Sequence, residues 1–224
     1  MLGVSGPIAY GIVAENMPQK DMKVCFLGSY CVGKTSITQR FVKGRFDEEY
    51  ISTIGAAFLS KSLFFQNIEY RFALWDTAGQ ERFRSLAPLT YRSAAAALIV
   101  YDITKQDSFD EVDFWLSELR REGPEGILIY VIGNKVDLEA FRVVDQEVAE
   151  KFAQTKGAFH FHTSAKTGQG VEEMFFNLCQ MDFTKTSLKE NGCMHHQNTI
   201  DVSNSTNSDV NNGGHRDRCR CRNT

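Results

Sequence analysis

The sequence predicts an α/β fold, in which a six-stranded, mostly parallel sheet with one antiparallel strand carries helices on both faces. Two observations support this prediction. Short apolar runs alternate with amphipathic stretches between residues 22 and 182, a pattern typical of a sheet covered on both sides. Two of the runs, 94–101 and 127–132, are apolar throughout, as expected of strands buried on both faces.

The six strands are expected in chain order. The first, Met22–Leu27, ends at Gly28. The runs Phe58–Phe65 and Tyr70–Trp75 flank Gln66-Asn67, which predicts a hairpin and with it the antiparallel pair. The last three strands are expected at 94–101, 127–132 and 159–162.

Two amphipathic helices stand out between these runs. Ser108-Phe-Asp-Glu111 has the pattern of a capping box and predicts a helix start. In the stretch that follows, apolar residues recur every three or four positions and so form one face of a helix. A second stretch near the end of the domain has the same pattern. The apolar positions are Phe109, Val112, Leu116 and Leu119 in the first helix, and Val171, Met174, Phe175 and Leu178 in the second.

The composition divides the chain into three parts. Residues 1–21 lack periodicity and are predicted to be a flexible extension, whereas 22–182 form the folded domain. Residues 183–224 are rich in Asn, Ser, Thr and Gly and have few large apolar side chains, which predicts a disordered tail. With 42% hydrophobic residues in 224, the chain has enough apolar surface for one sizeable core.

Charge and cysteine content narrow the function classes. Lys and Arg number 25 against 28 Asp and Glu, a net charge of -3, so no basic excess points to a nucleic-acid partner. No apolar run approaches the ~18 residues of a membrane span. No secretory signal is recognised before the six cysteines, so an intracellular protein without disulfides is expected.

The first predicted strand leads into a phosphate-binding motif. Gly28-Ser-Tyr-Cys-Val-Gly33-Lys34-Thr35 matches G-x-x-x-x-G-K-[ST] between a strand and a helix. The glycines let backbone N–H groups wrap an anion at the helix N-terminus. Lys34 can reach the outer phosphates and the Thr35 hydroxyl can bind Mg²⁺. The motif predicts a nucleoside triphosphate site.

The third predicted strand ends in a second motif, Trp75-Asp-Thr-Ala-Gly-Gln-Glu81. Asp76 can hold Mg²⁺ through water, and Gly79 lets a backbone N–H approach a γ-phosphate. Gln80 is then placed to orient an attacking water. A simpler alternative is an Asp that only caps the following segment.

Two further motifs follow later strands and point to the base. Asn134-Lys-Val-Asp137 follows the fifth strand, and Thr163-Ser-Ala-Lys166 follows the sixth. The Asp137 carboxylate can accept two N–H bonds from guanine, for which adenine offers no matching pair, so guanine is favoured. This argues against the alternative of an ATP-dependent P-loop kinase.

Together the four motifs resemble those of the Ras-like small GTPases, over about residues 22–182, with the P-loop small GTPase fold. Ile54-Gly-Ala-Ala-Phe58, Trp75–Phe83 and the cysteine-bearing tail are similar to the Rab family. Three stretches resemble the early-endosomal branch of that family. They are Ser52–Leu59, Ser85–Pro88 and Tyr101–Phe109.

The resemblance implies a GTP-hydrolysing switch of vesicle-mediated, endocytic membrane traffic, with segments 45–58 and 77–92 as its switches. It implies Gln80 as the catalytic residue and Mg²⁺ bound by Thr35, Thr53 and Asp76. An aromatic effector-facing trio maps to Phe58, Trp75 and Thr90. The implied GTP-binding residues are Ser29, Tyr30, Cys31, Val32, Gly33, Lys34, Thr35, Ser36, Phe46, Thr53, Asp76, Gly79, Asn134, Lys135, Asp137, Ser164, Ala165 and Lys166.

Two positions depart from the family pattern. Tyr30 stands where the family has a small residue, close to Gln80 and to the place where an activating protein inserts its arginine. A bulky phenol there predicts slow hydrolysis and poor stimulation, and in the extreme a GTP-loaded scaffold that scarcely hydrolyses. Thr90 stands where the family has a tyrosine, which leaves the effector-facing trio incomplete.

The chain ends in Cys219-Arg-Cys221-Arg-Asn-Thr224. Because Arg222 and Asn223 are not an aliphatic pair, the ending is no ordinary CaaX signal. The resemblance favours geranylgeranylation of both cysteines, since one lipid binds reversibly and two anchor stably. The alternatives are a single lipid, or two solvated cysteines on an unlipidated signalling GTPase.

The resemblance also implies partners and a location. The partners are GTP and GDP, an exchange factor, an activating protein, effectors, a GDP-dissociation inhibitor, the prenylation machinery and a membrane, with no nucleic acid and a monomeric chain. The location is the cytoplasmic face of early endosomal or related endocytic membranes, in exchange with the cytosol.

Two histidine groups are not explained by these motifs. His160 and His162 alternate with phenylalanines and share one face of the sixth predicted strand; a metal site is an alternative there to an ordinary strand face. Cys193, His195 and His196 lack a second Cys/His pair at zinc-finger spacing and are expected to be solvated.

Overall fold

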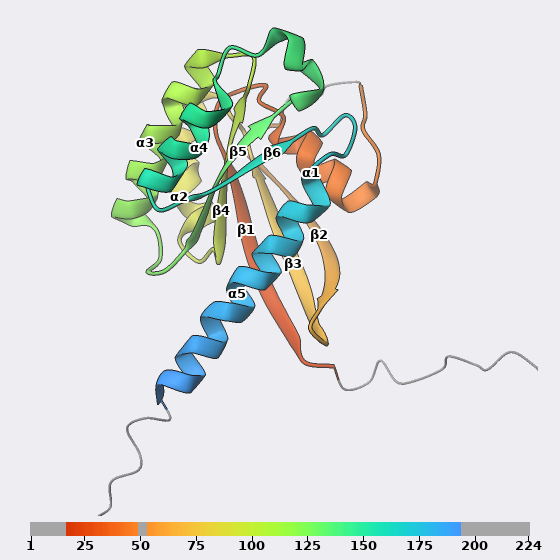
Figure 1. The fold of residues 1–224 in the computed structure, drawn as a ribbon, viewed down its shortest axis with the longest axis vertical. Coiled ribbons are helices and arrows are strands. Elements are labelled where there is room, and N and C mark those ends of the chain that lie inside the picture. Colours follow the sequence, from red (N-terminus) through yellow and green to blue (C-terminus); the bar gives the residue numbers. More distant parts are fainter. Residues whose placement is uncertain (1–16, 49–52, 194–224) are drawn as a thin grey trace, which may run out of the picture. The chain divides into compact units, whose positions relative to one another are not determined.

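The computed structural model describes residues 17–48 and 53–193 of the chain. Its strands form one sheet in the order β2-β3-β1-β4-β5-β6 (Figure 1). Within the described residues, β2 alone is antiparallel, to β3, and the other pairs are parallel. The predicted fold class is confirmed. The strands are β1 (Gln19–Leu27), β2 (Ala56–Phe65), β3 (Ile68–Thr77), β4 (Ala96–Asp102), β5 (Leu128–Asn134) and β6 (Phe159–Thr163).

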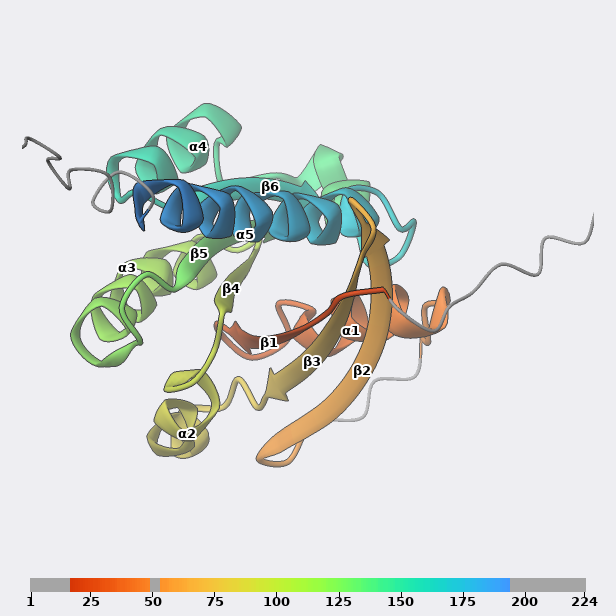
Figure 2. The same cartoon turned by 90° about the horizontal axis from the view of Figure 1, so that it is seen from below.

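Helices cover both faces of this sheet (Figure 2). Residues of α1 and the first turns of α5 share one core cluster with the strands, and residues of α2, α3 and α4 share the other. The helices are α1 (Lys34–Lys43), α2 (Ala87–Tyr91), α3 (Gln106–Glu122), α4 (Gln146–Thr155) and α5 (Val171–Cys193), with short 3-10 turns η1 (Glu81–Leu86) and η2 (Val136–Phe141).

Aromatic and aliphatic side chains fill the two cores. On the α1 and α5 side, Phe41 and Phe175 stack with ring centroids 3.5 Å apart, and Phe72 meets Phe41 edge-on at 5.7 Å. The predicted apolar faces of the helices at α3 and α5 are buried, which confirms their spacing. These contacts hold the helices against the sheet. They thereby also set the position of the sheet edge at which the carboxyl ends of the parallel strands meet.

The predicted hairpin is present between β2 and β3. Gln66 and Asn67 have φ values of 49° and 59°, the left-handed pair of a two-residue hairpin turn. The turn sets the register, so that Phe58 lies opposite Trp75 and Ala57 opposite Asp76. The hairpin thereby carries Asp76 to the same edge as the end of β1.

The ends of the folded region lie beyond the predicted limits of 22 and 182. β1 begins at Gln19, because Gln19–Asp21 pair with Glu69–Arg71 of β3, and Asp21 forms an ion pair with Arg71 at 2.7 Å. At the other end α5 continues to Cys193. The chain divides into one unit up to Lys185 and a second from Thr186. Most of the predicted N-terminal extension and tail lies outside the described residues.

The predicted capping box at Ser108 is wrong. The helix α3 begins two residues earlier, at Gln106, with Lys105 as the N-cap. The Ser108 hydroxyl is buried, donates to the Lys105 carbonyl oxygen at 2.7 Å and accepts from the Asp102 amide at 3.0 Å. The serine therefore ties the helix to the end of β4 instead of capping it.

Among the described residues, none of the helices combines the length and the apolar character that crossing a bilayer requires.

Candidate functional site

The phosphate-loop motif connects β1 to α1. Two of its glycines have positive φ, 124° at Gly28 and 98° at Gly33. A Cβ at Gly28 would lie 2.2 Å from the Val100 carbonyl oxygen, and one at Gly33 would lie 2.2 Å from Nδ2 of Asn134. Because L side chains fit neither the dihedral angles nor the space, both positions require glycine.

Lys34 lies folded into this loop. Its side chain is buried, and Nζ donates to the carbonyl oxygens of Gly28 at 2.8 Å and Ser29 at 2.7 Å. Burial lowers the pKa of Lys34 to about 8, although the nearby Asp76 carboxylate opposes the shift. A Cβ at Gly79 would lie 2.4 Å from Nζ, so this glycine brings the backbone after β3 directly to the lysine. The arrangement provides a cation and backbone N–H groups for an anion.

Three oxygen-bearing side chains meet beside Lys34. Thr35 Oγ1 donates to Asp76 Oδ2 at 2.6 Å and lies 2.9 Å from Thr53 Oγ1, which is 3.3 Å from the same Oδ2. Burial raises the pKa of Asp76, while the bonds from Thr35 and the charge of Lys34 oppose that shift. Asp76 Oδ1 is buried and has no hydrogen-bond partner among the described residues. Hard oxygen donors and a buried, unpartnered carboxylate oxygen fit Mg²⁺.

The two later motifs line a cavity of about 420 Å³. Asp137, at its rim, accepts from the Ser164 hydroxyl at 2.6 Å. The Arg40 side chain donates to the Ala165 carbonyl oxygen at 2.8 Å and also to that of Lys166, which holds this loop against α1. The residues lining the cavity are Cys31, Gly33, Ser36, Phe46, Glu48, Asn134, Lys135, Asp137, Leu138, Ala165 and Lys166.

Asn134 joins the phosphate loop to the base cavity. Its Nδ2 donates to the Val32 carbonyl oxygen at 2.9 Å. Its Oδ1 accepts from the Thr163 hydroxyl and from the Ala165 amide, both at 3.2 Å. One buried amide side chain thus makes three bonds and ties its own strand end to two segments that are far apart in the sequence, the phosphate loop and the loop after β6.

Asp102 is a site residue that the sequence analysis missed. It ends β4, is buried and forms an ion pair with Lys135 Nζ at 2.6 Å. Burial tends to raise the pKa of Asp102, but hydrogen bonds from Lys135 and Thr104 outweigh it and lower the pKa. The pair orients Lys135, whose backbone is left-handed with φ 72°. The sequence did contain a signal for this residue, since Asp102 directly follows the fully apolar run 94–101.

A second cavity, of about 840 Å³, lies beside Gln80. Tyr30 and Gly79 line it, as does Arg84, which pairs with Glu111 of α3 at 2.7 Å. Tyr30 is 45% exposed. It lines this cavity together with Gln80, so the two side chains border the same space.

The predicted effector-facing trio is present only as a pair. Phe58 is 57% exposed and meets Trp75 edge-on at 5.7 Å, and Lys23 Nζ lies 4.9 Å from the indole centroid. Thr90 is 4% exposed and donates to the Ala87 carbonyl oxygen at 2.7 Å. Its assignment to the exposed surface is wrong, because the small side chain turns inward and bonds its own helical turn. Cys219 and Cys221 lie outside the described residues.

Comparison with known proteins agrees with this geometry. The sequence model of the Ras family matches residues 23–183. Ras-related protein Rab-31 of Homo sapiens is 49% identical over 159 residues, which cover 71% of this chain and 82% of the relative. Ras-related protein Rab-21 of Bos taurus is 47% identical over 158 residues, covering 70% and 71%, and that of Homo sapiens is 46% identical, covering 70% of each chain.

Proposed function

The chain belongs to the Ras family and is a GTP-binding, GTP-hydrolysing small GTPase of the Rab type; from this premise we propose that it acts as a switch of vesicle-mediated traffic at early endosomal membranes. The observation that carries the proposal is the convergence of four motifs at one sheet edge, around Lys34, Asp76 and Asn134. Similarity to Rab-21 and Rab-31 supports the endosomal branch.

We propose that Thr35, Thr53 and Asp76 hold Mg²⁺ together with the nucleotide. When bound, the ion would neutralise negative charge on the nucleotide's phosphates. The Thr35 and Thr53 hydroxyls are already 2.9 Å apart and share Asp76 Oδ2 as an acceptor. Lys34 reaches the outer phosphates in exchange for its bonds to Gly28 and Ser29. Thr53 then links the state of the nucleotide to the first switch.

We propose that Gln80 orients the attacking water. It directly follows Gly79, whose backbone approaches Lys34 and thus the place of the outer phosphate. The alternative of a scaffold that hardly hydrolyses GTP is not favoured. The relatives to which the chain is similar are Rab proteins, a family of GTP-hydrolysing enzymes.

Replacing Gln80 with Leu is expected to lower GTP hydrolysis stimulated by an activating protein about a hundredfold, because the water loses its orientation. Single-turnover hydrolysis of the preloaded protein measures this. The matched control Gln106→Leu changes a glutamine that lines the same cavity and pairs with Asp110, and should hydrolyse normally. Tyr30→Ser is expected to stay close to the wild-type rate; a large acceleration would restore the scaffold hypothesis.

The membrane association is proposed to rest on Cys219 and Cys221, each carrying a geranylgeranyl group. Two chains give a stable anchor where one binds reversibly. Arg216, Arg218, Arg220 and Arg222 surround the two cysteines and add roughly 1 kcal/mol each at an anionic leaflet. We infer that this anchor holds the protein on the cytoplasmic face of the membrane, and that a GDP-dissociation inhibitor returns it to the cytosol.

A Cys219→Ser/Cys221→Ser double variant is expected to move from endosomal membranes to the cytosol, since it can take no lipid at this pair. Fluorescence localisation and fractionation, with intact mass of the protein from cells, report the change. Each single variant distinguishes one lipid from two. Cys193→Ser is the matched control and should stay on membranes; a double variant that also stays there would contradict the anchor.

Other partners follow from family membership and are proposed as classes only. An exchange factor, an activating protein, a GDP-dissociation inhibitor and prenylating enzymes would act on a monomeric chain, without nucleic acid. The exposed Phe58, together with the partly buried Trp75 that it contacts, is the proposed contact for effectors. Because Thr90 is buried, it adds nothing to this contact.

A further inference from the structure

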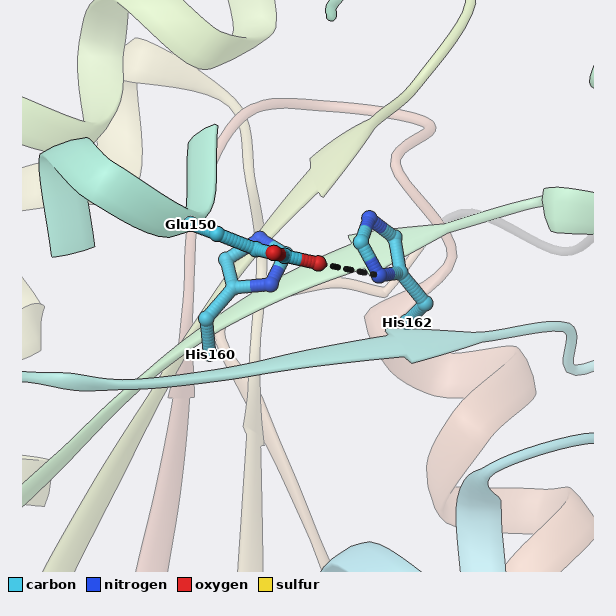
Figure 3. Close-up of side chains that lie close together, drawn as sticks. All are labelled: Glu150, His160 and His162. Carbon is cyan, nitrogen blue, oxygen red and sulfur yellow. Dashed lines mark ion pairs between the residues drawn. The ribbon is translucent and has the colours of Figure 1, made fainter. Parts of the chain in front are cut away.

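Three potential metal ligands gather between α4 and β6, separate from the nucleotide site. Glu150 extends from α4 toward the rings of His160 and His162 on β6 (Figure 3). The two histidines share a strand face because they are two residues apart. One ligand atom from each of the three residues lies within 4.8 Å of the others. His162 Nδ1 is 3.7 Å from Glu150 Oε1, and the two imidazole centroids are 4.6 Å apart.

The surroundings favour the neutral form of both imidazoles, which is the form that binds metals. Burial lowers the pKa of His160 to about 3, helped by the neighbouring His162 and Arg142. Burial and Arg142 likewise lower the pKa of His162, while Glu150 and Glu139 oppose that shift. The Arg142 guanidinium is itself paired with Glu139 at 2.7 Å, which reduces its repulsion of a cation.

The surroundings orient the rings. His160 Nε2 lies 3.1 Å from the hydroxyl of the buried Tyr101, which leaves Nδ1 as the ligand atom. A Cβ at Gly133 of β5 would lie 2.6 Å from that hydroxyl and 3.2 Å from His162 Cδ2, so this glycine makes room for both groups. His162 Nε2 is buried and has no hydrogen-bond partner among the described residues. A second ring nitrogen bonded to another group is the usual support of a metal-binding histidine, and His160 has this support from Tyr101.

We propose that Glu150, His160 and His162 bind a divalent transition-metal ion of the Zn²⁺ type, with a fourth position open to solvent. Two imidazoles and a carboxylate form a ligand set that Zn²⁺ accepts, whereas Mg²⁺ prefers oxygen ligands throughout. Zn²⁺ is therefore expected to prefer this site, and Mg²⁺ the oxygen ligands at Thr35 and Asp76.

Binding requires a small local closure. Tetrahedral Zn²⁺ with bonds of about 2.0–2.1 Å places its ligand atoms about 3.3 Å apart, closer than the present limit of 4.8 Å. The Glu150 side chain is 47% exposed and can move onto the rings. A cavity of about 550 Å³, lined by Glu150, Gln154 and His160, gives an ion access from solvent. A bound ion would pin α4 to the edge strand of the sheet.

The test titrates the full chain, loaded with GDP and Mg²⁺, with Zn²⁺ against a chromogenic indicator. The His160→Gln/His162→Gln variant is expected to lose one equivalent of Zn²⁺ that the wild type binds. The matched control His195→Gln/His196→Gln removes two histidines of the tail and should keep that equivalent. Co²⁺ serves as a second probe, since a nitrogen and oxygen site gives visible absorption without the near-ultraviolet band of thiolate ligands.

Two conservative variants keep the test decisive if the double variant does not fold. Glu150→Gln changes an exposed residue and is expected to weaken Zn²⁺ binding. Tyr101→Phe removes only the hydroxyl behind His160, and the expected loss in affinity is about 10–100-fold. The proposal is overturned if the core variants bind the same number of equivalents with the same affinity as the wild type, or if only the tail control loses an equivalent.

Discussion

Replacing Asp137 with Asn is expected to weaken GTP binding by about 10²–10⁴-fold and to improve the binding of xanthosine triphosphate. The carboxylate accepts two N–H bonds from guanine, and each bond to a charged group is worth about 1.5–3 kcal/mol. An amide repels one of these donors but can donate to the altered edge of xanthine. Competition between the two nucleotides on the purified variant measures both changes.

The structure supports this exchange as a local change. Asp137 lies at the rim of the base cavity and bonds the Ser164 hydroxyl, a contact that an amide oxygen can keep. Glu139→Gln is the matched control, since Glu139 lies on the same turn η2 but pairs with Arg142 outside the cavity. The base-pocket assignment would be wrong if Asp137→Asn bound GTP as tightly as the control.

Replacing Thr35 with Asn is expected to lower the affinity for a non-hydrolysable GTP analogue by about 10–100-fold relative to GDP. The loss corresponds to one hydrogen bond or ligand contact to a charged group. The Thr35 hydroxyl lies between Asp76 and Thr53, so an Asn side chain disturbs the whole oxygen cluster. The triphosphate complex is expected to lose most because the ion would neutralise the charge of its outer phosphates.

Binding of the analogue with and without a chelator tests the ion directly. The wild type is expected to bind poorly once Mg²⁺ is removed, and Thr35→Asn to respond little. Thr155→Asn is the matched control, a Thr-to-Asn exchange at the exposed end of α4. Mg²⁺-independent binding by the wild type would refute the proposed cluster of Thr35, Thr53 and Asp76.

The interior of each strand and the four motifs were predictable from local patterns. The runs ending at Leu27 and near Asp76 and Asn134 are mostly apolar, and each is followed by a glycine or a polar residue. Parallel strands then bring those ends to one edge, so the site follows from topology. The hairpin at Gln66-Asn67 was equally local, since two short strand-like runs flank a pair that contains Asn, a residue that tolerates positive φ better than most.

Features that depend on distant contacts could not be predicted. Gln19–Asp21 look like a polar extension until β3 supplies a partner strand. Ser108 has the sequence of a cap, but its hydroxyl bonds the end of β4. Thr90 turns inward to its own helical turn, and Asp102 pairs with Lys135 at the end of the neighbouring strand. Hydrophobic periodicity predicts neither side-chain orientation.

The three bonds of Asn134 have a kinetic consequence. Its amide holds Val32 of the phosphate loop and Ala165 of the base loop at the same time, so neither loop relaxes alone. We infer that a shift of either loop disturbs a bond to this one side chain and is thereby passed to the other loop. A partner that displaces one loop is therefore expected to speed nucleotide release.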